Sequence, residues 1–166
     1  AARLASETHY DAAILLVSKA LRIDPQNSRA LLLRAQCFNN IGEEEKAIED
    51  LNQAISIDPR MDSAYMSRAR TWSIVGKGTL AKADIAKAIQ LSPKNAETFA
   101  AAGYVYASLK EYSKAVEYYD QAIRLNPAQV LYFNNRAMAL IGAGKDKEAL
   151  NDYAYVVQHW KHDEEA

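Results

Sequence analysis

The chain has few of the residues that form disulfides, bind nucleic acid or cross membranes. It has one cysteine in 166 residues, Cys37, so it cannot form an intramolecular disulfide. Its formal net charge is −1, which argues against nucleic acid as the main ligand, because phosphate binding needs a concentrated basic face. It has no run of about 18 apolar residues, as a membrane span would need. We therefore expect no nucleic-acid partner and no membrane span, while the compartment stays open, with the cytoplasm favoured.

Motifs for chemistry are also scarce. The chain has three histidines, and no glycine-rich phosphate loop, CxxC or HExxH motif. His159 and His162 are three residues apart beside acidic residues, but a charged helix end explains this group better than a metal site. Cys37 lies next to Phe38 on an apolar helical face, which indicates a core residue rather than a nucleophile. We expect no catalytic residue, no metal and no cofactor.

The few prolines are evenly spaced. Pro25, Pro59, Pro93 and Pro127 each follow the previous one by 34 residues. Proline disfavours helix in the residue before it, so each of them indicates a helix end. Small and large apolar residues recur at the same interval: Ala13, Ala47, Ala81, Ala115 and Ala149 form one column, and Leu4, Phe38, Trp72, Tyr106 and Leu140 form another. Such a period is typical of stacked repeats rather than of a single globular core.

Each repeat has the pattern of two helices. Tyr65, Ala69 and Trp72 fall at i, i+4 and i+7, the spacing of one helical face. Glycine marks the turn between the two helices in three copies, and Lys110 replaces it in the copy at 96–129. The pattern predicts helices at 28–41, 44–57, 62–75, 78–91, 96–109, 112–125, 130–143 and 146–160.

These columns resemble the tetratricopeptide repeat (TPR) family, whose pattern runs W-x2-L-G-x2-Y, then A-x3-F, then A, then P. The copy at 96–129 carries Phe99, Gly103, Tyr106, Ala115, Tyr119, Ala122 and Pro127. The resemblance implies an all-α, right-handed superhelical solenoid of antiparallel helix pairs, with about four complete repeats. Since Ala1 aligns with the middle of a first helix, the N-terminal repeat is expected to be partial. The expected array covers 1–160, with the partial repeat at 1–27, repeats at 28–61, 62–95, 96–129 and 130–160, and a polar tail at 161–166.

One position departs from the family pattern. Where leucine is usual, the four copies have Arg34, Arg68, Ala102 and Arg136. Later in the same copies stand Asp50, Asp84, Tyr118 and Asp152, so aspartate accompanies each arginine. Either the two residues pair across the helices of one repeat, with an apolar contact in the copy that lacks them, or they are independent solvated charges. An exposed pair would contribute only about 0–1 kcal/mol to stability.

The resemblance also implies a function. In this family, the first helix of each pair lines a concave groove that binds a peptide or a partner's helix, which makes the chain a non-catalytic protein-binding module. Residues that vary between copies are the expected lining. The candidate partner-binding residues are Arg29, Gln36, Asn39, Met66, Arg70, Tyr104, Asn134 and Met138. Tyr104 offers a broad ring with a polar tip, and Arg70 could anchor a carboxylate.

Two other functions stay open. Val157 and Trp160 form an apolar edge on which another copy could pack, giving a self-assembling oligomeric scaffold through the terminal repeats. The chain could also be the recruiting or regulatory arm of a larger enzyme. The heat-shock carboxylate clamp of co-chaperone TPR domains is not expected: Asn135 matches one clamp residue, but Ala100 and Tyr104 stand where a lysine and an asparagine are needed.

Overall fold

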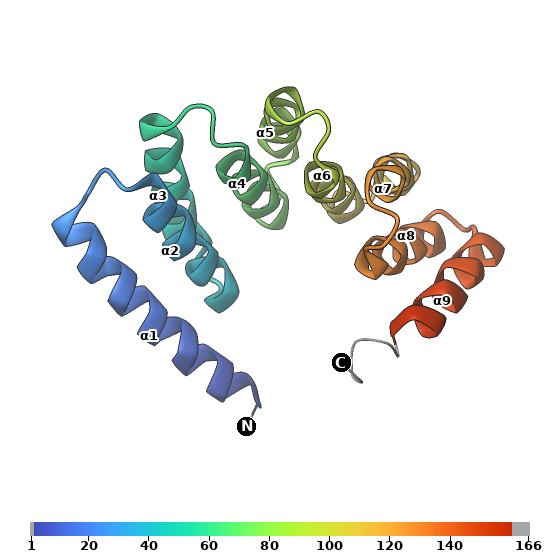
Figure 1. The fold of residues 1–166 in the computed structure, drawn as a ribbon, viewed down its shortest axis with the longest axis horizontal. Coiled ribbons are helices and arrows are strands. Elements are labelled where there is room, and N and C mark those ends of the chain that lie inside the picture. The colour runs from blue at the N-terminus through green and yellow to red at the C-terminus, as the bar shows by residue number, and fades with distance from the viewer. Residues whose placement is uncertain (1, 161–166) are drawn as a thin grey trace. The chain divides into compact units, whose positions relative to one another are not determined.

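The computed structural model describes residues 2–160, and the side chains of residues 9–159. Residues 2–160 form nine α-helices and no strand (Figure 1). The helices are α1 (Ala2–Ile23), α2 (Ser28–Ile41), α3 (Glu44–Ile57), α4 (Asp62–Ile74), α5 (Gly78–Leu91), α6 (Ala96–Ser108), α7 (Tyr112–Leu125), α8 (Val130–Gly142) and α9 (Asp146–Trp160). All eight predicted helices are confirmed, and α4, α6 and α8 end one residue earlier than predicted. The tail expected at 161–166 lies outside the described residues.

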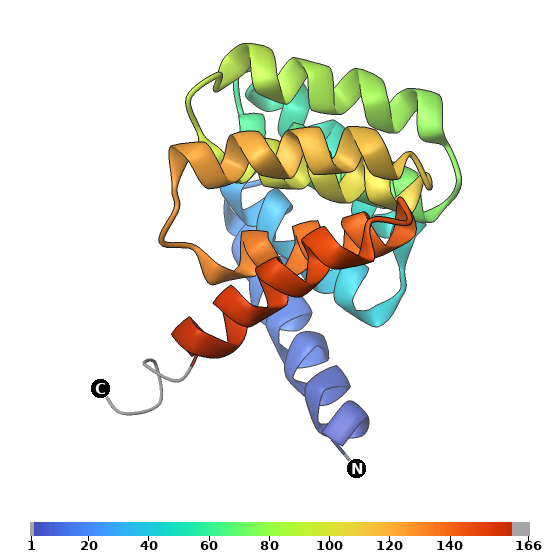
Figure 2. The same cartoon turned by 90° about the vertical axis from the view of Figure 1, so that its right-hand side faces the viewer.

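The chain divides into two compact units, Ala1–Leu91 and Ser92–Ala166. The first unit contains α1 to α5, and the second contains α6 to α9. Within each unit, helices that are consecutive along the chain pack as antiparallel pairs, as α2 does with α3 and α6 does with α7 (Figures 1 and 2). The predicted all-α architecture of stacked helix pairs is therefore confirmed. The single array over 1–160 and its superhelical path stay predictions.

The turn inside each complete repeat is closed by a residue in the left-handed conformation. The φ angles are 77° at Gly42, 76° at Gly76 and 74° at Gly144, and Lys110 adopts 62° in the copy without glycine. The next amide donates a hydrogen bond back to the carbonyl of the large apolar column, as from Glu43 to Phe38 at 2.9 Å. The same backbone turn therefore forms in every copy, with a steric cost at Lys110 that glycine avoids.

The N-terminal segment differs from the expected partial repeat. Thr8 stands 34 residues before Gly42, at the turn position, and α1 continues through it without a turn. A β-branched residue strongly disfavours the left-handed conformation that the turn needs. The segment therefore forms one continuous helix rather than the end of a first helix followed by a second.

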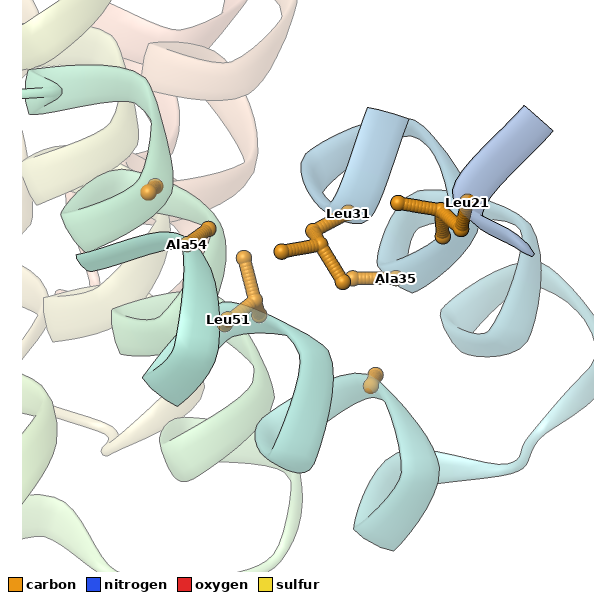
Figure 3. Close-up of a cluster of buried hydrophobic side chains, with 7 residues drawn as sticks. Leu21, Leu31, Ala35, Leu51 and Ala54 are labelled. Atoms are coloured by element: carbon orange, nitrogen blue, oxygen red, sulfur yellow. The ribbon is translucent and has the colours of Figure 1, made fainter. Parts of the chain in front are cut away.

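The core of the first unit lies between α1, α2 and α3. Leu31 of α2 and Leu51 of α3 point toward one another, beside Leu21 of α1 (Figure 3). Alanine stands where the helices approach most closely, and both Ala35 and Ala54 are fully buried. Burying a leucine contributes about 1.5–3 kcal/mol, so these residues hold the three helices together.

In the second unit, a glycine makes room for a buried ring. Tyr119 of α7 is 2% exposed and packs with Ala115 and Ala139. A Cβ placed on Gly103 of α6 would lie 2.7 Å from the Tyr119 ring, closer than van der Waals contact allows. Gly103 therefore sets the close approach of α6 to α7.

Candidate functional site

The first helices of successive repeats lie side by side within each unit. In the first unit α2 contacts α4, and in the second unit α6 contacts α8. We call the exposed side of α2 and α4 the first face, and the exposed side of α6 and α8 the second face. All eight candidate partner-binding residues are on these four helices.

The first face is polar and carries two guanidinium groups. Arg29 and Gln36 of α2 and Arg70 of α4 are exposed. Asn39 is half-buried, and its Oδ1 accepts a hydrogen bond of 3.1 Å from Oγ1 of Thr71, which links α2 to α4. Asn39 thus contributes to the packing of the two helices.

Met66 differs from the other candidates of the first face. It is only 8% exposed and lies in the interior of the first unit. A neighbouring position on α4, Ser73, is also buried, and its hydroxyl donates to the carbonyl of Arg70 at 2.7 Å. The expectation that Met66 offers its side chain to a partner therefore needs correction, because α4 buries that side chain against its own unit.

The second face is apolar. Leu131, Met138 and Ile141 of α8 are 49%, 60% and 51% exposed. Asn134 of α8 and Tyr104 of α6 are half-buried. Three large aliphatic side chains exposed along one side of a helix are more than the isolated surface residues that need no explanation. This face therefore has the composition of a contact surface.

The predicted pairing of arginine with aspartate is confirmed in all three copies. Nε and Nη2 of Arg34 donate to the two carboxylate oxygens of Asp50, both at 2.7 Å. Arg68 binds Asp84 and Arg136 binds Asp152 with the same two-bond geometry, at 2.6–2.8 Å. The three aspartates are 5–7% exposed. The hydrogen bonds to these aspartates raise the pKa of each arginine above its ordinary value.

Each of these arginines also makes a contact that the sequence reasoning missed. Nη1 reaches the second helix of the preceding repeat, where it donates to Ser18, Asn52 or Asp120 at 3.1, 2.7 and 2.6 Å. A signal was present: this position is polar in the copies that precede an arginine, whereas Ala86 precedes Ala102. We call these contacts the arginine ladder. It ties each arginine helix to the helix before it and the helix after it.

The copy at 96–129 replaces the ladder with an aromatic contact. Tyr118 stands at the aspartate position, and its ring lies 5.0 Å from the ring of Tyr106, measured between centroids. Burial raises the pKa of the Tyr118 hydroxyl, and the neighbouring Tyr106 adds to the shift. The predicted apolar substitute is therefore a tyrosine pair.

The residues considered for metal binding and reactivity have structural contacts. The His159 ring stacks on Tyr155 with centroids 3.9 Å apart, and its Nδ1 lies 2.8 Å from the Tyr155 carbonyl oxygen, while His162 lies outside the described residues. Cys37 is 5% exposed, and burial raises the pKa of its thiol. No group of three His, Cys, Asp or Glu that could hold a metal ion occurs in the part of the chain that the structure describes. Across that same part, every helix is too short or too polar to cross a membrane.

The apolar edge expected near the C-terminus is partly covered. Tyr153 packs with Ala137, Leu140 and Ala149, whereas Val157 is 64% exposed. The side chain of Trp160 lies outside the described residues. The scaffold hypothesis is thus left with Val157 on this edge.

Two family models, both described as tetratricopeptide repeat, match residues 4–71 and 96–129, which together make up more than half of the chain. Among solved structures, the chain is similar to a thermophilic TPR protein of Thermus thermophilus, with a TM-score of 0.86 and 25% identity over 98% of this chain and 89% of that one. It is also similar to MamA, with a TM-score of 0.73 and 25% identity over 95% of this chain and 92% of that one.

Curated relatives match a shorter segment. The heat-shock protein cognate co-chaperone sgt12 of Aspergillus fumigatus is 44% identical over 43 residues, which are 26% of this chain and 13% of the co-chaperone. The STIP1 homolog of Dictyostelium discoideum is 40% identical over 45 residues, 27% of this chain and 8% of that protein. The chain thus corresponds to a small part of these relatives' length. The repeat columns, the helix pairs and the family matches agree: this chain belongs to the tetratricopeptide repeat family, and its repeats form a protein-interaction module.

Proposed function

We propose that this chain is a non-catalytic adaptor that binds a peptide or a helix of a partner protein on the exposed sides of its first helices. The observation that carries the proposal is the division between repeated and unrepeated positions. The repeated Ala47 and Leu51 are fully buried, whereas the unrepeated Met138 is 60% exposed. Residues that pack the repeats are thus separate from residues that a ligand would contact.

The two faces favour different ligand groups. Arg29 and Arg70 on the first face suit carboxylate side chains, because a guanidinium binds a carboxylate through two parallel hydrogen bonds. Leu131, Met138 and Ile141 on the second face suit apolar side chains of a bound helix or extended segment. A ligand of the first face should therefore be acidic, and a ligand of the second face apolar.

Tyr104 is the residue of the second face from which we expect the largest single contribution. It is half-buried on α6, so its ring position is restricted by packing before a ligand arrives. A rigid aromatic ring with a polar tip loses little conformational entropy on binding, and such residues are enriched at binding hot spots. Replacing it with alanine should weaken binding by about 2 kcal/mol, or roughly 30-fold.

The experiment uses peptides selected against the whole chain from a random peptide library displayed on phage. Dissociation constants of the selected apolar peptides are measured with the wild-type chain and with Tyr104→Ala and Met138→Ala. Leu150→Ala is the matched control, because Leu150 is 67% exposed but lies on α9, away from both faces. The proposal expects the first two variants to bind more weakly while the control binds as the wild type does. Equal affinity in all four proteins would exclude the second face as the binding surface.

The first face has an independent test with acidic peptides from the same library. Arg70→Ala should weaken their binding, and added salt should weaken it further, because exposed charges are screened at high ionic strength. Binding of the apolar peptides should respond little to salt. Acidic peptides that bind Arg70→Ala and wild type equally would remove the first face from the proposal.

A further inference from the structure

Helix α1 exposes an apolar stripe that the rest of the first unit does not cover. Leu15, Leu16 and Ile23 are 56%, 64% and 88% exposed. Ala12 and Ala20 are exposed on the same side. The opposite side of α1 carries Val17 and Leu21, which pack in the core with α2 (Figure 1). The helix is therefore apolar on two sides, and α2 covers one of them.

The later repeats show what such a stripe does. Ala20 stands 34 and 68 residues before Ala54 and Ala88, which are fully buried in their helix pairs. Leu16 occupies the position of Asp50, the aspartate that pairs with Arg34. The stripe on α1 thus corresponds to a helix-packing surface, with leucine in place of the charge. It suits a helix that approaches through apolar contact and brings no arginine.

The charges beside the stripe favour a second copy of the same helix. Asp11 and Lys19 are both exposed and lie four residues before and after Leu15, about 12 Å apart along the helix. A two-fold axis through Leu15 would place Asp11 of each copy against Lys19 of the other. A parallel pair would instead place each charge against its like. The stripe is therefore self-complementary only in the antiparallel arrangement.

We propose that two copies of this chain form a symmetric dimer by antiparallel packing of their α1 helices. Leu15 and Leu16 pack at the centre of the contact and Ile23 packs toward its ends. Lys19 covers the leucines with its aliphatic stem while its ammonium group reaches Asp11 of the other copy. A contact made by one helix from each copy is smaller than a standard stable interface, so the dimer is weak and depends on concentration.

The test is sedimentation velocity of the whole chain at concentrations up to about 1 mM. The wild type should shift from monomer to dimer as the concentration rises. Leu16→Asp should weaken the dimer about tenfold or more, because it places a charge in the apolar contact. Leu150→Asp on α9 is the control, since Leu150 is exposed to a similar extent, and its dimer should equal that of the wild type. Circular dichroism checks that both variants keep their helices.

Charge exchange tests the antiparallel arrangement. Asp11→Lys and Lys19→Asp should each weaken the dimer several-fold, because each places like charges against one another. The double variant Asp11→Lys/Lys19→Asp should restore the wild-type dimer, since both cross pairs are then attractive again. A monomeric mass at all concentrations, a failure of the double variant to restore the dimer, or a dimer lost in Leu150→Asp but kept in Leu16→Asp would overturn the proposal.

Discussion

The arginine ladder permits a quantitative test in the first unit. Arg34 forms two charge-assisted hydrogen bonds with Asp50, and their side chains are 23% and 7% exposed. Hydrogen bonds to charged groups contribute about 1.5–3 kcal/mol each when buried, whereas exposed ion pairs contribute about 0–1 kcal/mol in total. Since Arg34 is partly solvated, we expect a coupling free energy of about 1–2 kcal/mol between the two side chains.

The assay is a double-mutant cycle of Arg34→Ala and Asp50→Ala, with unfolding in urea followed by circular dichroism. Because repeat proteins unfold as coupled units, the data are fitted with a nearest-neighbour model. Lys46 and Glu43 form the control pair in the same unit, with nitrogen and oxygen 3.0 Å apart and side chains 55% and 46% exposed. Their coupling should be about 0.3–0.5 kcal/mol, as for exposed pairs on one helix.

The two single substitutions should differ. Arg34→Ala leaves the nearly buried carboxylate of Asp50 without its partner, at a cost of about 2–3 kcal/mol. Asp50→Ala costs less, because Arg34 keeps its contact with Ser18 and reaches solvent. A coupling equal to that of the control pair, or an Asp50→Ala variant less stable than Arg34→Ala, would refute the reasoning that burial of the carboxylate determines the energy.

Three further substitutions test single features of the packing. Gly103→Ala should lower the free energy of unfolding by about 1–3 kcal/mol, because the new Cβ meets the buried Tyr119 ring, and a gain from helix propensity would be seen instead if the ring moved aside. Lys110→Gly should raise the free energy of unfolding by up to about 1 kcal/mol in urea titrations, by relieving the positive φ angle. Cys37 should react slowly with Ellman's reagent in the native protein and rapidly in urea, because burial raises its pKa and the thiolate is the reactive form. Since the folded thiol holds its proton more tightly, stability should also fall as the pH rises above the ordinary thiol value, and Cys37→Ala should remove that dependence.

The sequence predicted the helices because the repeat supplies several copies of each signal. A turn residue seen once is weak evidence, but Gly42, Gly76 and Gly144 at one interval fix the phase of all the helices. The same redundancy carried the prediction of the arginine pairs. Aspartate is present in the copies that have arginine and absent beside Ala102, and this covariation within one chain reports a contact.

The features that could not be predicted are those without equivalent copies. Met66 is flanked in its column by Leu32, Ala100 and Asn134, so its burial depends on local packing in α4 that the period does not report. The continuous α1 arises from Thr8 at the turn position, a single exception whose effect depends on backbone energy rather than on pattern. Periodicity therefore predicts which residues pack, and gives less information on how an exception is accommodated.

The separation of packing from recognition is visible at adjacent positions of one helix. Ala137 is fully buried and Met138 is 60% exposed, although they are neighbours on α8. Any larger side chain at Ala137 would overpack the junction with α9, whereas Met138 can change without disturbing a repeated contact. Neighbouring residues are thus under different constraints, one set by the stacking of helices and the other by a ligand. This division lets one array of repeats keep its fold while the chemistry of its first helices varies, so the fold defines where a partner binds and the unrepeated side chains define which partner it is.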